Sequence, residues 1–444
     1  MDVVDIKKNE SVYKDFELMD SFKVVIYSLL GIFIFFIPIK INGYTNNIIY
    51  HLYFFIKEEY IQLLKIYITI MVITGVILPI VKQKDKYCDV FLKIKKGTRL
   101  ISILFIFIIF SKTEYRGYTN DSVLFMQEIV LQSSVLILIS SIFMPLLTEY
   151  GLLEVVEAYC HKYTKKTFKI SGKGVLNIMV YLFVDVFSGL FMTNLLYKKG
   201  KLRQNEACII ASCFSFMSII NCLYISDELK LTSKIITVVM AGILSLIVNY
   251  FVCRMYPLKN KKKSYMCKTS YKESNFKKDK FKNAIRKYMA SKEKKKITTY
   301  ILENFRESFN IIMTILPNLV IIIFVGEFLI NNTGLIDTIS HILYPFIELL
   351  KLPNKEQLSE FICICMFNSN RYIEFINNNI ADISILIIFI ISIVQTISIT
   401  TNMLYIDNIC IPLKKRELLV IAIEKVLITL IIISLIYYLL IGYI

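Results

Sequence analysis

The sequence predicts an all-α polytopic membrane protein with two inverted-topology repeats, each containing a re-entrant helical hairpin, preceded by extra N-terminal transmembrane helices. Of the 444 residues, 56% are hydrophobic, and the mean hydropathy is +0.58. Several apolar runs approach roughly 20 residues, the length at which a helix crosses a bilayer. No run shows the period-two alternation of a β-barrel strand. Polar residues interrupt two of the runs, which is typical of re-entrant segments.

The N-terminal region, residues 1–112, is expected to hold the extra transmembrane helices. The first span is Val24–Ile39, and the apolar segment Ile48–Ile56 is too short to cross, so we expect it to lie in the membrane interface. Ile61–Val81 is long enough for a full span, and Leu100–Phe110 is a shorter apolar run.

Positive charge predicts the orientation of these spans. Lys and Arg near the ends of spans remain on the cytoplasmic side, and Lys82–Arg99 is a strongly basic loop. We therefore place this loop and the N-terminus inside. The span Val123–Leu147, at the start of the first repeat (residues 113–256), then runs from outside to inside. The basic segment Thr148–Gly174 is consequently cytoplasmic.

The run Leu176–Tyr197 is predicted to enter the membrane and turn back. It is apolar but contains Asp185 and further polar residues, which are costly in lipid unless they face protein, water or a ligand. A full crossing would place the basic run Lys198–Arg203 outside, against the positive-inside rule. With a re-entrant hairpin, Ala207–Tyr224 crosses outward and Ile235–Val252 returns inward.

The linker between the repeats, residues 257–304, is strongly basic. The stretch Arg254–Lys296 has 17 Lys and Arg against 3 Asp and Glu, so it is expected in the cytoplasm. Two alternatives remain for its role. It either docks the head groups of anionic membrane lipids or serves as a solvated connector. A nucleic-acid partner is not expected, because no DNA- or RNA-binding motif accompanies the charge.

The second repeat, residues 305–444, follows the same pattern from the opposite face. It begins with an outward span, Ile311–Ile330, and an amphipathic segment on the outer side, Leu335–Leu350. A hairpin that is broken near residue 368 follows at Phe361–Ile376. The last two segments are an inward span, Ile385–Met403, and a final outward span, Leu418–Leu440. In transporters with such repeats the substrate site lies near the membrane midplane, between the two halves.

Several motifs of the central stretch, Pro145–Cys222, resemble those of the YjiH-type membrane proteins. These proteins carry a nucleoside-recognition or Gate domain. The family shows P-L-T-D-Y-G-L, a P-G-R-type turn, a G-S-x-x-x-G-x-x-I-T-N hairpin and R-E-A-A-x-I-A-T-N-F-S-x-x-S. The corresponding segments here are Pro145–Leu152, Ser171–Lys173, Phe187–Asn194 and Asn205–Ser215. This chain departs from the family with Glu149 for Asp, Lys173 for Arg, Cys213 for Asn, and Thr401 where the family has an acid.

The resemblance implies a binding site for a small polar solute, formed by the two hairpins and the spans that follow them. Ser, Thr, Asn and Gln both donate and accept hydrogen bonds, as a nucleobase or ribose requires. The expected substrate-binding residues are Asp185, Ser188, Thr193, Asn194, Ser212, Ser215, Asn221, Asn368, Ser369, Asn370, Gln395, Thr400 and Asn402. Asp185 could also carry a proton, bind a cation or pair with a lysine at the hairpin mouth.

The expected function is a secondary transporter or permease for a nucleoside-like or other small polar solute. The alternative is a Gate-domain scaffold or regulatory protein that does not transport. Enzymatic activity is not expected, since the three histidines (His51, His161 and His341) are far apart and no Walker A motif is present. No cofactor or structural metal is expected, and a proton or sodium ion would drive transport. The resemblance also implies the bacterial plasma membrane, contact with membrane lipid and a homo-oligomer.

Overall fold

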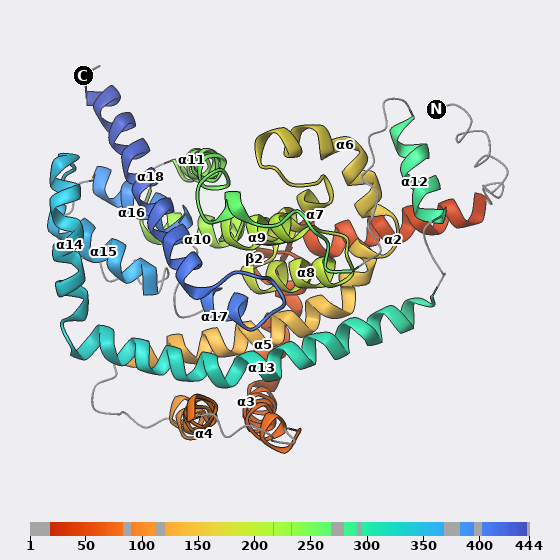
Figure 1. The fold of residues 1–444 in the computed structure, drawn as a ribbon, viewed down its shortest axis with the longest axis horizontal. Coiled ribbons are helices and arrows are strands. Elements are labelled where there is room, and N and C mark those ends of the chain that lie inside the picture. Colours follow the sequence, from red (N-terminus) through yellow and green to blue (C-terminus); the bar gives the residue numbers. More distant parts are fainter. Residues whose placement is uncertain are drawn as a thin grey trace.

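The computed structural model shows a helical protein with one small β-hairpin (Figure 1). Five of its described helices are long and apolar enough to cross a membrane: α3 (Ile48–Lys82), α5 (Asn120–Thr148), α11 (Lys234–Val252), α13 (Ile297–Asn332) and α18 (Lys415–Ile441). The chain is therefore a helical membrane protein. The structure describes residues 18–82, 90–111, 120–215, 217–231, 233–267, 279–290, 295–367, 382–394 and 402–441.

The N-terminal region contains one element that the sequence did not predict. After α2 (Leu18–Phe36), a β-hairpin pairs β1 (Ile39–Ile41) with β2 (Tyr44–Asn46), and positive φ at both turn residues suits its two-residue turn. The expected segment Ile48–Ile56 forms the first part of α3, and a kink at Tyr60 divides it from the second part. Its position in the membrane interface stays a prediction.

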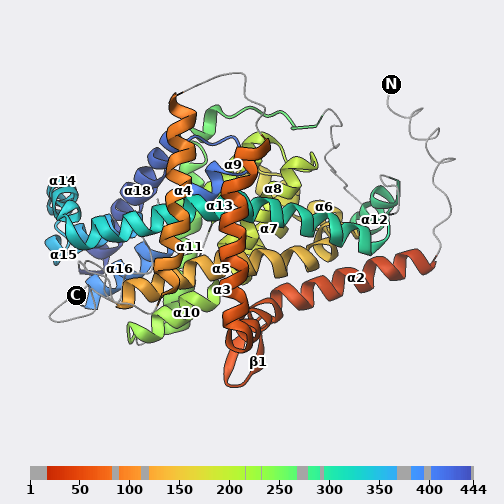
Figure 2. The same ribbon diagram turned by 90° about the horizontal axis from the view of Figure 1, so that it is seen from below.

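Helices α5 and α13 form the central pair of the fold and pack along each other (Figures 1 and 2). The Ser308 hydroxyl donates to Ser141 at 3.1 Å, and the Asn331 amide donates to Ser122 at the same distance. These contacts make the pair antiparallel. An inverted repeat requires this relation between its two first helices, and the repeat itself stays a prediction.

Helix α3 and helix α4 (Val90–Phe110) run across this pair rather than along it (Figure 2). The close approach of α3 to α13 depends on Gly75. A Cβ atom at this position would clash with the backbone carbonyl oxygen of Met313 and lie 2.9 Å from the Pro317 ring. A small residue at a crossing allows two helix backbones to come together in this way.

Gly75→Ala should lower the free energy of unfolding by about 1–3 kcal/mol, because the added methyl must push two packed helices apart. The matched control is Gly242→Ala in α11, where a Cβ meets nothing within 4 Å. That change should be neutral or stabilising by up to about 1 kcal/mol. Titration with sodium dodecyl sulfate, followed by circular dichroism, measures both. Equal effects of the two substitutions would contradict the contact at the crossing.

The central stretch folds into five short helices: α6 (Leu152–Thr167), α7 (Lys173–Phe183), α8 (Val186–Lys198), α9 (Gln204–Cys213) and α10 (Ile219–Glu228). The predicted break in Leu176–Tyr197 is present, because α7 ends at Phe183 and α8 begins at Val186. The two helices have 11 and 13 residues and pack against each other. Neither alone can cross a bilayer of roughly 30 Å. Entry of this hairpin into the membrane stays a prediction.

The outward span expected at Ala207–Tyr224 is not one continuous helix, and its crossing of the membrane stays a prediction. The chain forms α9 and α10 instead, separated by a non-helical segment that contains Ser215 and Ser218. The Ser218 side chain accepts a hydrogen bond from Asn221 N, so it caps the start of α10. Serine favours such a break, because its hydroxyl can form hydrogen bonds with neighbouring backbone groups when the chain is not helical.

The remaining elements belong to the linker and the second half. They are the 3-10 helix η1 (Leu258–Asn260), α12 (Lys280–Ala290), α14 (Leu335–Leu349), α15 (Lys355–Phe367), α16 (Asp382–Val394) and α17 (Asn402–Asp407). Helix α12 packs on α6 and buries Ala284 and Ile285. The described part of the linker therefore packs on the protein through this helix, and its role stays a prediction. The predicted tip of the second hairpin lies outside the described residues.

Candidate functional site

The tip of the first hairpin is organised by Asp185. Its carboxylate accepts hydrogen bonds from the backbone N–H groups of Phe187 and Ser188, at 2.9 and 3.0 Å. The residue is extended, buried and directly precedes α8, so it is the N-cap of that helix. An acid suits this position because it satisfies free N–H groups and lies at the positive end of the helix dipole. Asp185 therefore has a structural role whether or not it also contacts a ligand.

A polar network inside the hairpin connects α7 and α8. The Thr193 hydroxyl donates to the Gly189 carbonyl oxygen at 2.8 Å. The Thr193 hydroxyl oxygen in turn accepts a hydrogen bond from the Asn177 amide at 2.7 Å and lies 3.0 Å from the Tyr181 hydroxyl. Because the Thr193 proton is already used, Tyr181 is the donor in that contact. Gly189 makes room for the Tyr181 ring, which any Cβ at this position would meet.

The hairpin also contacts its surroundings through predicted site residues. Ser188 shares a hydrogen bond of 2.7 Å with Ser140 of α5. Asn194 accepts from the Cys410 backbone N–H, which follows α17, at 3.1 Å. On α3, Tyr50 lies near the Asn221 side chain and within electrostatic reach of Asp185. The structure thus brings Asp185 and Asn221 into one neighbourhood.

Two buried amides of the hairpin keep unused hydrogen-bonding atoms. Among the described residues, the Asn177 side-chain oxygen and the Asn194 side-chain nitrogen have no partner, although both side chains are almost completely buried. Buried polar atoms without a partner are uncommon and costly. The two arms of the hairpin therefore offer one free acceptor and one free donor.

The other predicted site residues are placed differently. The Ser212 hydroxyl donates to the Cys208 carbonyl oxygen of its own helix at 2.7 Å, which is common for serine in membrane helices. Ser215 is buried in the break after α9, and Asn402 is buried at the start of α17. Five predicted residues lie outside the described part of the chain: Asn368, Ser369, Asn370, Gln395 and Thr400.

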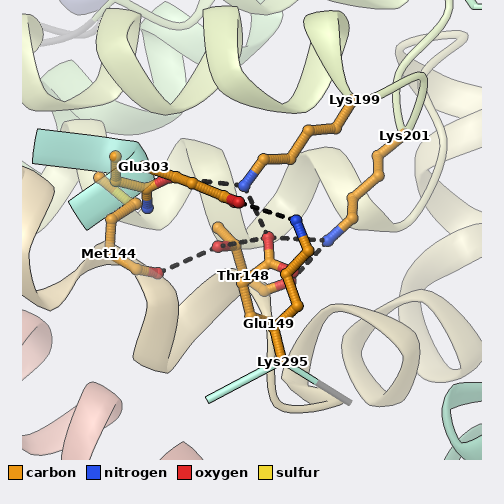
Figure 3. Close-up of polar contacts among 8 residues, drawn as sticks. Met144, Thr148, Glu149, Lys199, Lys201, Lys295 and Glu303 are labelled. Carbon is orange, nitrogen blue, oxygen red and sulfur yellow. Dashed lines mark hydrogen bonds and ion pairs between the residues drawn. The ribbon is translucent and has the colours of Figure 1, made fainter. Parts of the chain in front are cut away.

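A buried charge cluster at the open end of the hairpin was not predicted (Figure 3). Glu149, which is 2% exposed, lies 3.0 Å from the Lys199 ammonium and 3.4 Å from that of Lys201. Lys201 is itself buried and donates to the Thr148 carbonyl oxygen at 2.6 Å. The cluster fastens the chain after α8 to the end of α5.

Surrounding residues complete this cluster. Lys199 also reaches the Asn304 side-chain oxygen on α13 at 3.4 Å, and Figure 3 shows the Lys295–Glu303 pair beside it. Burial, together with the nearby Tyr27, Tyr300 and Glu149, raises the pKa of Tyr150 to about 12. The phenol is consequently neutral at pH 7. The motif P-L-L-T-E-Y-G-L and the basic run after α8 contained these residues, but nothing in the sequence joined the two segments.

Lys425 is a second unpredicted feature. It lies in the middle of α18 at 1% exposure and donates to the Cys213 carbonyl oxygen at 3.3 Å, where α9 ends. Among the described residues no carboxylate pairs with it. A lysine ammonium has three donors and is expensive to bury, so an intramembrane lysine of this kind marks a functional position by default. The available signal was a lone lysine in the apolar run Leu418–Leu440.

Comparisons with known proteins assign no function to this site. No family model matches the sequence, and no solved structure matches it. The chain is similar to an uncharacterized protein of Alkalihalophilus pseudofirmus, with 22% identity over 383 residues. The matched region covers 80% of this chain and 81% of that protein. The similarity extends over most of both chains, and the relative has no known activity that could be compared with this site.

Proposed function

We propose that this membrane protein is a secondary transporter or permease for a nucleoside-like or other small polar solute, which binds at the α7–α8 hairpin. The observation that carries the proposal is the pair of buried amide atoms, Asn177 Oδ1 and Asn194 Nδ2, that no group in the described part of the chain satisfies. A solute that presents both a donor and an acceptor, as nucleobases do, would satisfy both atoms. The resemblance to the Gate domain supports the same solute class.

The elements around the hairpin support solute passage in a helical membrane protein. Helices α9 and α10 are short and separated by a non-helical, serine-containing segment. Interrupted helices of this kind form the binding sites of many secondary transporters, where irregular backbone lines a cavity. The gradient of a proton or a sodium ion would drive the movement.

Binding should depend on Asn194 and not on Ser212. Asn194→Asp retains the acceptor for Cys410 N–H but removes the free donor, so solute affinity should fall by about tenfold. Ser212→Ala should leave affinity unchanged, because that hydroxyl bonds to its own helix. Thermal stabilisation of the detergent-solubilised protein by a panel of nucleosides, nucleobases and amino acids measures this. If no solute stabilises the wild-type protein, the proposed binding site fails.

One observation favours the alternative, a Gate-domain scaffold that does not transport. Asp185, Ser188 and Thr193 each form hydrogen bonds within the hairpin or to α5. A scaffold would need only these contacts. Counterflow of radiolabelled solute in proteoliposomes separates the two functions. Solute binding without counterflow would support the scaffold, and counterflow abolished by Asn194→Asp would support the transporter.

A further inference from the structure

A basic pocket lies away from the hairpin core, between the end of α6, the start of α9 and the linker residues that follow α11. Its volume is about 490 Å³, within the range of small-molecule pockets. Six basic side chains line it: Lys165, Lys169, Arg203, Lys259, Lys261 and Lys263. Glu206 is the one acidic side chain in its lining. Charge from three separate segments of the chain therefore converges on one cavity.

Backbone hydrogen bonds hold the linker wall of this pocket in place. The N–H groups of Gln204 and Asn205, at the start of α9, donate to the carbonyl oxygens of Ser264 and Lys262 at 2.9 and 3.0 Å. Arg203 pairs with Tyr265 in an isolated antiparallel bridge, and its guanidinium also donates to the Tyr265 hydroxyl at 3.2 Å. The linker lysines thus belong to a formed wall.

The described part of the chain neutralises only some of the positive charge in the pocket. Glu206 accepts from Arg203 N–H and from the Ser171 hydroxyl, at 3.0 and 3.3 Å. Lys261 pairs with Glu417 at 2.7 Å. Lys169, Lys259 and Lys263, by contrast, pair with no acid in the described part of the chain. All three are solvent-exposed, so water screens their mutual repulsion, and an anion bound between them would lower it further.

The pocket wall also contains a polar atom that lacks a partner. The Asn205 side-chain oxygen is buried and makes no hydrogen bond to any residue that the structure describes. Rotation of this amide would present its NH₂ group to the cavity, and the two orientations have nearly the same shape. The pocket would then offer an amide donor in addition to the ammonium groups.

We infer that this pocket binds a phosphate-bearing anion. A phosphate group carries up to two negative charges and several acceptor oxygens, and lysines bind it as point charges. The ligand is either the head group of an anionic phospholipid or a soluble phosphate compound, which share this chemistry. The inference is independent of solute transport, because the pocket and the α7–α8 hairpin use different residues.

The test uses the full-length protein and two probes, inorganic pyrophosphate in neutral detergent and nanodiscs containing phosphatidylglycerol. The pocket variant combines Lys169→Gln, Lys259→Gln and Lys263→Gln. The control combines Lys162→Gln, Lys282→Gln and Lys296→Gln, three exposed lysines outside the pocket with the same change in charge. Thermal unfolding is compared with that in chloride of equal ionic strength and in phosphatidylcholine nanodiscs.

The pocket variant should lose the stabilisation by at least one probe, with affinity weakened by at least about tenfold, while the control variant retains it. Stabilisation of the wild type by phosphatidylglycerol alone identifies a lipid ligand. Stabilisation by pyrophosphate identifies a soluble phosphate ligand. The inference is overturned if neither probe stabilises the wild-type protein, or if the two triple variants lose stabilisation equally.

Discussion

Glu149→Gln should lower the free energy of unfolding by about 3–5 kcal/mol. Glu149 is almost fully buried beside Lys199 and Lys201, and Lys201 is buried as well. The substitution keeps the size of the side chain but removes its charge, so the Lys201 ammonium is left without compensation in a poorly hydrated place. The energy of a buried ion pair lies mainly in this penalty, which appears when one partner is removed.

Two further variants make this prediction specific. The control is Asp227→Asn, which removes the acid of an exposed pair with Lys234 and should cost at most about 1 kcal/mol. The double variant Glu149→Gln with Lys201→Met should recover part of the loss, because the stranded ammonium is gone. Detergent-based unfolding titrations measure all three. A loss below 1 kcal/mol for Glu149→Gln would show that Lys199 and Lys201 reach water without it.

Local sequence signals predicted where two of the apolar runs are interrupted, between α7 and α8 and within α3. The break before α8 was predictable because an acid in an apolar run needs satisfied hydrogen bonds, and an N-cap supplies them. The apolar segment Ile48–Ile56 was likewise set apart from the span that begins at Ile61, and α3 is divided between the two by a kink at Tyr60. Lys57, Glu58 and Glu59 lie before the kink and are good helix formers, so the first helical part extends through them.

The candidate site was less accessible to sequence reasoning, because its chemistry depends on which polar atoms are already satisfied. Ser212 and Asn194 looked equivalent as polar residues of the central motif. The first bonds within its own helix, and the second keeps a free donor. Contacts between residues that are distant in sequence also could not be predicted. Lys425 reaches Cys213 across 212 positions, and no periodic pattern records such a pairing.

Lys425→Met should fold at least as stably as the wild type but transport solute about 100-fold more slowly. Methionine has a similar length and no charge, so the substitution removes the desolvation penalty of the ammonium, while it leaves the Cys213 carbonyl oxygen without its donor. A hundredfold loss corresponds to about 2.7 kcal/mol of lost transition-state stabilisation. Counterflow in proteoliposomes, with the solute identified by thermal stabilisation, measures the rate. The matched control is Lys415→Met, an exposed lysine at the start of the same helix.

The two measurements on Lys425→Met separate a functional lysine from a structural one. A lysine that only fastens α18 to the end of α9 would cost stability when replaced, and the surviving folded protein would transport normally. A lysine that carries a proton or contacts the solute would do the reverse, and Lys425→Arg would keep the charge but lose the ability to release a proton at ordinary pH. Counterflow preserved in the Arg variant but not in the Met variant would therefore assign Lys425 to charge recognition. Loss in both would favour proton transfer.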